Sequence, residues 1–183
     1  EETGYYAQGH FVFDSKKSGA VTVSHLRFGD TPIRSTYAIG DNQAEFIACH
    51  QSTFLENYDL LDKARTGATF LLNAPWPLDK VWDHLPRHIQ AYIISKQLKV
   101  YVIDAYRVAR EAGLGPRINT IMQTCYFALS GLLPEADAVR HIKTMVQRSY
   151  QFKGGTILEA NEKAIDQALS HLQQLPVPDQ VTA

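Results

Sequence analysis

The sequence predicts an α/β protein with a mainly parallel, Rossmann-like sheet, an added β-hairpin and a helical C-terminal part. Three short apolar segments, 45–50, 68–73 and 99–104, are typical of strands that are covered on both faces. A helical pattern follows each of these segments. The alternation of strand and helix favours right-handed crossovers between parallel strands.

The hairpin is predicted from residues 6–14 and 20–28, which are rich in β-branched and aromatic residues and are joined by a short turn. A doubly wound sheet normally begins with a strand, a glycine-rich turn and a helix. This first glycine-rich unit is absent from the segment, so we expect the sequence to be a fragment of a larger chain.

The helices are predicted from apolar spacing and from stop signals. Ser52 can cap a helix that follows the third strand, and Pro86 divides the next helical stretch because it disfavours a helical Leu85. The tail 176–183 has no periodicity and is interpreted as a linker or frayed end, which leaves 1–175 as the domain. The predicted helical stretches are 52–64, 77–97 in two pieces, 105–113, 118–134, 135–150 and 156–175.

The composition is that of an ordinary globular protein, with 45% hydrophobic and 20% charged residues. The net charge of −1 gives no overall field that would attract nucleic acid or an anionic membrane. Cys49 and Cys125 are the only cysteines and form no CxxC, which favours neither a disulfide framework nor a zinc or iron–sulfur site and suggests the cytosol. No apolar run reaches the roughly 20 residues that a membrane-spanning helix needs.

Three loops carry groups that can bind an anion. The turn DSKKSG offers Lys16 and Lys17, although lysines are also common in surface turns that bind no ligand. The loop GLGPRIN leads into a helix, but Gly113 as a C-cap and Asn119 as an N-cap explain it without a ligand. The stretch FKGGTILEANEKA places Asn161 inside a helix, where asparagine is mildly unfavourable.

Other candidate sites have simpler explanations. His84 and His88 have a metal-ligand spacing, but Pro86 lies between them and no HExxH motif is present, so we expect no metal site. Cys49 and His50 are adjacent in a strand and point to opposite faces. His25 and Arg27 share one strand face and need either an ion pair or an anion. These residues therefore form no catalytic constellation.

Several long stretches, taken together, resemble one family over nearly the whole chain. The γ-type catalytic domain of pyruvate:ferredoxin (flavodoxin) oxidoreductase is similar in order and spacing to YAQGHFVFDSKKSGAVTVSHLRFGDTPIRSTY, FIACHQSTFLENYDLL, GATFLLNAPW, KVYVIDAYRVAREAGLGPRINTIMQTCYFALSGLLP and LEANEKAIDQAL. The resemblance implies a multidomain, homodimeric, cytoplasmic enzyme, a pyruvate synthase that transfers electrons. It converts pyruvate, coenzyme A and an oxidised carrier to acetyl-CoA, CO2 and a reduced carrier, which is ferredoxin or flavodoxin.

The resemblance also implies how the work is divided among domains. Thiamine diphosphate with Mg2+ and the 4Fe-4S iron–sulfur clusters are expected on other domains, so this segment has no catalytic residue of its own. Its implied role is to help bind coenzyme A, together with an upstream glycine-rich loop. The residues that match the family's coenzyme A contacts are Lys17, Asn119 and Asn161.

The sequence departs from the family pattern beside two of these residues. Gly115-Pro116 replaces the usual Gly-Gly before the arginine of the GRIN-type turn, and Ala160 precedes Asn161 in place of methionine. Two alternatives stay open. The chain can be a non-catalytic interaction domain of the same ancestry in a redox fusion protein, or part of a 2-oxoacid oxidoreductase with another substrate.

Overall fold

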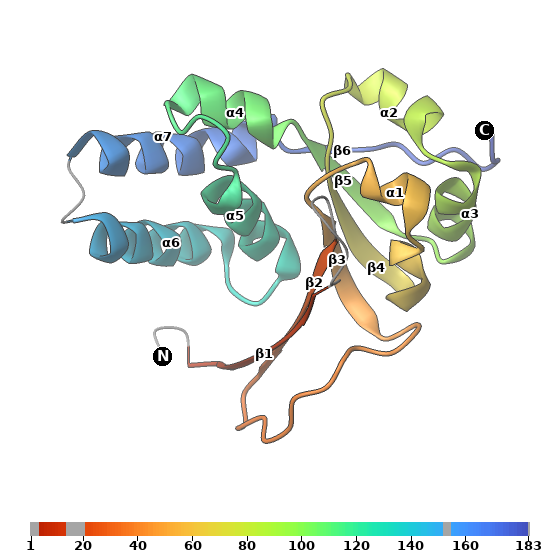
Figure 1. Ribbon diagram of the computed structural model, residues 1–183, viewed down its shortest axis with the longest axis horizontal. Coiled ribbons are helices and arrows are strands. Elements are labelled where there is room, and N and C mark those ends of the chain that lie inside the picture. The colour runs from red at the N-terminus through yellow and green to blue at the C-terminus, as the bar shows by residue number, and fades with distance from the viewer. Residues whose placement is uncertain (1–3, 14–20, 152–154, 183) are drawn as a thin grey trace.

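The protein contains two separate sheets, and the computed structural model describes residues 4–13, 21–151 and 155–182. The strands are β1 (Tyr6–Phe13), β2 (Thr22–Gly29), β3 (Ala44–Cys49), β4 (Ala64–Asn73), β5 (Lys99–Ile103) and β6 (Gln173–Gln174). The larger sheet has the order β3-β4-β5-β6, with β3, β4 and β5 parallel and β6 antiparallel to β5 (Figure 1). Strands β1 and β2 form an antiparallel hairpin beside it. The predicted fold class is confirmed.

Helices cover both faces of the larger sheet. The helices are α1 (Phe54–Asn57), the 3-10 helix η1 (Leu60–Lys63), α2 (Leu78–His84), α3 (Arg87–Ser95), α4 (Ala105–Ala112), α5 (Asn119–Ser130), α6 (Glu135–Tyr150) and α7 (Gly155–His171). One face packs against α1, η1, α2 and α3, and the other packs against α4, α5 and α7, while α6 lies on α5 and α7 (Figure 1). Among the described residues, no helix has both the length and the apolar composition that crossing a membrane requires.

The predicted break at Pro86 is present. Leu85 adopts an extended conformation between α2 and α3, with φ −79° and ψ 132°, and its side chain is buried. The fully buried Gln90 donates hydrogen bonds to the carbonyls of Trp82 at 2.8 Å and Leu85 at 3.2 Å. Gln90 thereby links the end of α2 and the connecting residue Leu85 to the start of α3, in addition to the bond that the Trp82 carbonyl accepts from the amide of Leu85.

The predicted helix over 52–64 is wrong as a single element. The structure divides it into α1 and η1, and Thr53 occupies the position before α1 without a side-chain cap. Ser52 therefore does not cap the helix. The division places both Leu55 and Leu61 in the core, and packing of these two side chains outweighs the helical periodicity of the segment.

The C-terminal end also differs from the prediction. Helix α7 ends at His171, before the predicted end at 175, and β6 follows it at the edge of the sheet. The amide of Leu175 donates to the carbonyl of Val100 at 2.9 Å, and the amide of Thr182 donates to Gln90 Oε1 at 2.8 Å. The described part of the tail thus lies against the domain, and its role as a linker remains a prediction.

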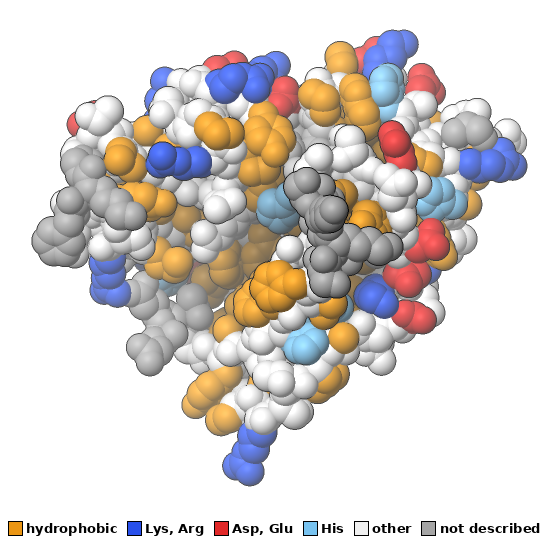
Figure 2. All heavy atoms as spheres, in the orientation of Figure 1, with side chains coloured by type: hydrophobic (Ala, Val, Ile, Leu, Met, Phe, Trp, Pro, Cys, Tyr) orange, Lys and Arg blue, Asp and Glu red, His pale blue; other side chains and the backbone are white. Residues whose placement is uncertain are grey.

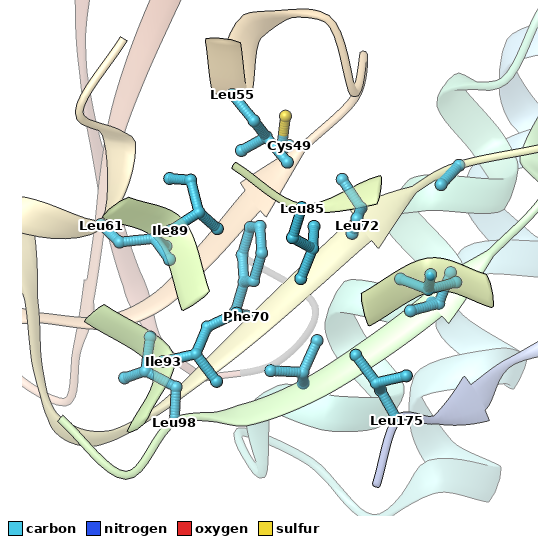
Figure 3. Packing of buried hydrophobic residues seen from close by; sticks show 14 of the residues in the cluster. Cys49, Leu55, Leu61, Phe70, Leu72, Leu85, Ile89, Ile93, Leu98 and Leu175 are labelled. Atoms are coloured by element: carbon cyan, nitrogen blue, oxygen red, sulfur yellow. The ribbon is translucent and has the colours of Figure 1, made fainter. Parts of the chain in front are cut away.

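The core has two layers, one on each face of the sheet. Phe70 and Leu72 project from β4 toward Leu85, Ile89 and Ile93 of the α2–α3 side (Figure 3). The intervening residue of β4, Leu71, points the other way, where it packs with residues of β5, α4 and α5. This alternation along a strand that is apolar on both faces is what the sequence predicts for a covered parallel strand.

A lysine fixes the end of η1. Lys96 Nζ donates to the carbonyls of Leu61 at 2.8 Å, Asp62 at 2.8 Å and Ala64 at 3.0 Å. These carbonyls lie at the end of η1 and the start of β4, and two of them also accept backbone hydrogen bonds, Leu61 from the amide of Ala64 and Asp62 from the amide of Asn42. A single ammonium group therefore joins the end of α3 to the segment that enters β4.

Replacement of Lys96 by methionine is expected to lower the free energy of unfolding by about 2 kcal/mol, since partly buried carbonyls lose charged donors. Urea unfolding would measure this loss. The matched control is Lys80→Met, because Lys80 is exposed and should change stability by less than about 0.5 kcal/mol. Equal effects of the two substitutions would contradict the role of Lys96.

Candidate ligand-binding site

The loop between α4 and α5 is anchored at both ends and exposed in the middle. Gly113 ends α4 in the left-handed region at φ 87°, as the sequence predicts for a helix C-cap, and Gly115 lies at φ 60°. Leu114 and Ile118 are buried in the core, whereas residues 115–117 are exposed. The loop therefore presents its backbone to solvent from a fixed position.

Asn119 lies at the start of α5 but does not cap it. Ile118 occupies the cap position with φ −101° and ψ −2°, and no side chain caps the helix. The predicted N-cap role of Asn119 is therefore wrong, because the buried Ile118 starts the turn one residue earlier. The Asn119 side chain is exposed in the first turn, beside backbone N–H groups that no side chain caps.

Asn161 lies in α7 and is only 3% exposed. Its Nδ2 donates to the carbonyl of Ile157 at 2.8 Å, and its Oδ1 accepts a hydrogen bond from Thr120 Oγ1 at 2.7 Å. Thr120 directly follows Asn119, so this bond joins the middle of α7 to the first turn of α5. The structure thereby brings two of the three predicted site residues to the same junction.

The hydrogen bonds of Asn161 leave part of its capacity unused. A side-chain amide has two N–H donors and an oxygen with two lone pairs, and the two hydrogen bonds to described residues use one donor and one lone pair. Burial leaves little room for a ligand to approach it. The geometry fits a residue that holds the start of α5 in place, while Asn119 presents the exposed amide.

Thr120 is the member of this junction that sequence reasoning missed. A threonine in the first turn of a helix is ordinary, and nothing in the sequence connects it to an asparagine on another helix. A second contact steadies the same region, because Lys163 Nζ of α7 donates to the carbonyl of Glu111 in α4 at 2.8 Å. Helix α7 is therefore bonded to both helices that flank the exposed loop.

The third predicted residue, Lys17, lies outside the described residues, as does its neighbour Lys16. The same holds for Lys153 and Gly154 of the FKGG stretch, although Gly155 begins α7. The role of Lys17 stays a prediction.

Among the described residues, His25 and Arg27 form hydrogen bonds with uncharged groups. Arg27 Nη1 donates to Gln8 Oε1 at 3.1 Å and to the carbonyl of Tyr37 at 2.6 Å, and the guanidinium lies 3.5 Å from the centre of the Tyr37 ring. The buried His25 accepts a hydrogen bond through Nδ1 from the amide of Ile39 at 3.0 Å. Burial, reinforced by His10, lowers the pKa of His25 and favours its neutral form. Among the described residues, local hydrogen bonds rather than an ion pair therefore hold both side chains, and an anion partner stays a prediction.

His84 and His88 lie on different helices because the chain breaks at Pro86. The Nδ1 atom of His84 lies 3.0 Å from the carbonyl of Lys80, and its ring lies against Trp76. The Nε2 atom of His88 is 3.7 Å from a carboxylate oxygen of Asp59. No group of three or more His, Cys, Asp or Glu within the described ranges is arranged to hold a metal ion.

Cys49 is buried at the end of β3, and its thiol donates to the carbonyl of Gln51 at 3.1 Å. Burial raises the pKa of Cys49 to about 11 and that of Cys125 to about 12. Both thiols therefore remain protonated at neutral pH, and the thiolate is the reactive form. Neither cysteine has the properties of a nucleophile.

Alkylation with iodoacetamide at pH 8 is expected to be at least about 100-fold slower for Cys49 and Cys125 in the folded protein than in urea. The raised pKa values mean that reactivity in the folded state increases only as pH rises toward 11. Peptide mass spectrometry after timed quenching would measure both sites. Rapid alkylation of folded Cys49 at pH 8 would contradict its assignment as a buried, unreactive thiol.

Comparison with known proteins identifies the family. The family model described as pyruvate ferredoxin/flavodoxin oxidoreductase matches residues 1–171. The chain belongs to this family. The chain is 57% identical over 175 residues to pyruvate-flavodoxin oxidoreductase of Trichormus variabilis and covers 14% of that protein. It is 45% identical over 178 residues to pyruvate:ferredoxin oxidoreductase of Moorella thermoacetica and covers 15% of it.

The family members that match are therefore much longer than this chain, which spans about 15% of their length. Among solved structures, subunit PORC of pyruvate oxidoreductase from Thermotoga maritima is similar in fold, with a TM-score of 0.70. That similarity covers 94% of this chain and 83% of PORC at 16% identity. It shows that the two chains share a fold.

Proposed function

We propose that this chain is the coenzyme A-binding domain of a pyruvate:ferredoxin or flavodoxin oxidoreductase. Membership of the family makes the 2-oxoacid reaction the leading candidate. The observation that supports the coenzyme A role is the junction of α5 and α7, where Asn119 is exposed beside the uncapped first turn of α5 and Asn161 holds Thr120.

The chemistry of this junction suits coenzyme A. The ligand carries a diphosphate, a 3′-phosphate and several amide groups. Uncapped N–H groups at the N-terminus of a helix favour phosphate, and an exposed asparagine amide can donate to phosphate or pair with a ligand amide. Lys17 would add a positive charge for one of the phosphates. The domain would bind coenzyme A and orient its thiol. Holding the thiol near the acetyl intermediate would raise the rate of acetyl transfer to coenzyme A.

The described residues do not fit an iron–sulfur cluster, which is one of the other cofactors that the family implies. An iron–sulfur cluster needs several cysteines at one place. Cys49 and Cys125 are buried in different layers of the core and are each alone there. We therefore assign the clusters to other domains of the intact enzyme. The resemblance to the family assigns thiamine diphosphate and Mg2+ to other domains as well, and those domains would supply the decarboxylation and electron-transfer chemistry.

We also propose that the intact enzyme is a cytoplasmic homodimer. Other domains of the same polypeptide would surround this domain, and the enzyme would pass electrons to ferredoxin or flavodoxin. The names of the relatives support the carrier, since they include both ferredoxin and flavodoxin oxidoreductases.

Lys17→Ala in the intact enzyme is expected to raise the apparent KM for coenzyme A about tenfold or more, because a charged contact to phosphate is lost. Decarboxylation of pyruvate in the absence of coenzyme A should change little. Steady-state kinetics and the isolated half-reaction would measure the two effects. Lys16→Ala is the matched control and should leave the KM unchanged, whereas an unchanged KM in Lys17→Ala would remove this residue from the site.

A further inference from the structure

One face of the β1–β2 hairpin is apolar and exposed. Phe11 and Phe13 of β1 lie on this face, and Leu26 of β2 lies on it opposite Gly9. The three large side chains are 55%, 73% and 46% exposed. The Phe11 ring and the end of the Leu26 side chain both lie beside the space that a side chain at Gly9 would fill, which makes the apolar surface continuous across the two strands.

The apolar face continues into a cavity between the hairpin and the helices. The cavity has a volume of about 220 Å³ and is lined by Tyr5, Ala7 and Phe28 on the hairpin side and by Phe127, Ile142 and Met145 on the helix side. Figure 2 shows hydrophobic side chains in the region between α6 and the hairpin. Met145, at the rim, is itself 46% exposed. The face and the cavity together form one surface, which we call the hairpin surface.

The hairpin surface carries no charge from either strand. Strand β1 contains no Asp, Glu, Lys or Arg, and β2 contains only Arg27, which is bonded to Gln8 and Tyr37 on the opposite face. In the described residues, β1 pairs with β2 alone. Exposed edge strands are normally protected by charged residues, and a two-stranded sheet is marginal by itself. These properties are typical of a surface that is covered.

We propose that the hairpin surface is a permanent interface with another domain of the same polypeptide. Relatives of this chain are about seven times as long, so most of their polypeptide lies outside the segment that they share with it. Permanent interfaces are more apolar and have fewer charges at their centre than those of partners that bind and leave, such as electron carriers. The proposal rests on the proposed function, which takes the chain as one domain of a multidomain enzyme.

Cysteine labelling in the full-length enzyme tests this interface. Leu26→Cys and Ser24→Cys place a thiol on the hairpin surface, and Ala91→Cys places one on an exposed part of α3 across the sheet. Ser24→Cys replaces a small exposed side chain and should not disturb folding. It therefore tests the same surface if Leu26→Cys fails to fold. Rates of maleimide labelling, each divided by the rate of the same variant in urea, are read by peptide mass spectrometry. Cys49 and Cys125 are buried and lie in other peptides, so they do not obscure the result.

The expected result is that the hairpin thiols label at least about tenfold more slowly than the thiol at position 91, at every protein concentration. Equal rates would overturn the proposal, because the surface would then be free. Protection that disappears when the dimer is diluted apart would also overturn it and would assign the surface to a second copy. The outcome is independent of coenzyme A kinetics, so failure of the interface and failure of the ligand site can be told apart.

Discussion

Replacing Phe70 with alanine is expected to lower the free energy of unfolding by about 3–5 kcal/mol. Phe70 is fully buried at the centre of β4 and packs with Leu85, Ile89 and Ile93 (Figure 3). Removal of its ring would leave a cavity that strands on both sides prevent from collapsing, since β4 is paired with β3 and β5. Urea unfolding followed by the fluorescence of the buried Trp82 would measure the loss.

Phe70→Leu provides the matched control, because leucine keeps the apolar character and much of the volume. Its loss should be less than half of that for alanine. A loss below about 1 kcal/mol for Phe70→Ala would show that the two-layer core does not depend on this ring, and it would contradict the packing described above.

Replacing Asn161 with leucine is expected to raise the apparent KM for coenzyme A in the intact enzyme about tenfold or more. The substitution removes the acceptor of the Thr120 hydroxyl and frees the first turn of α5 from α7. It also removes the bond to the carbonyl of Ile157, so we expect an additional loss of stability of about 1–3 kcal/mol. Steady-state kinetics and thermal unfolding would separate the two effects.

A double-mutant cycle with Thr120→Val tests whether Asn161 acts through the start of α5. The two changes should couple by at least about 0.5 kcal/mol in coenzyme A binding, because each removes the same bond. Pyruvate decarboxylation without coenzyme A should be nearly unchanged in all three variants. Loss of stability with an unchanged KM would leave Asn161 as a purely structural residue.

Much of the fold could be predicted because its signals are local. Strands β3 and β5 were found within one residue of their observed ends, and the break before Pro86 follows from steric clash with a helical Leu85. Strand β6 could not be predicted, since Gln173 and Gln174 are exposed and have no apolar pattern. Its position depends on pairing with β5 and on the burial of Leu175, which are contacts over a long sequence distance.

The candidate site was predictable only in part, for the same reason. The resemblance selected Asn119 and Asn161 separately, and the bond between Thr120 and Asn161 that brings their helices together spans 41 residues. Local rules suggested that Asn119 caps α5, and this was wrong because burial of Ile118 sets where the helix begins. Tertiary packing therefore decides which polar groups at this junction remain available.

Hydrogen–deuterium exchange of the intact enzyme with and without coenzyme A tests the central claim most directly, because it needs no substitution. We expect coenzyme A to slow exchange of the amides in 114–121, at the loop and the first turn of α5, and in 157–162 of α7, while β5 stays unchanged. Unchanged exchange at both segments under saturating coenzyme A would contradict the assignment of this junction as part of the binding site.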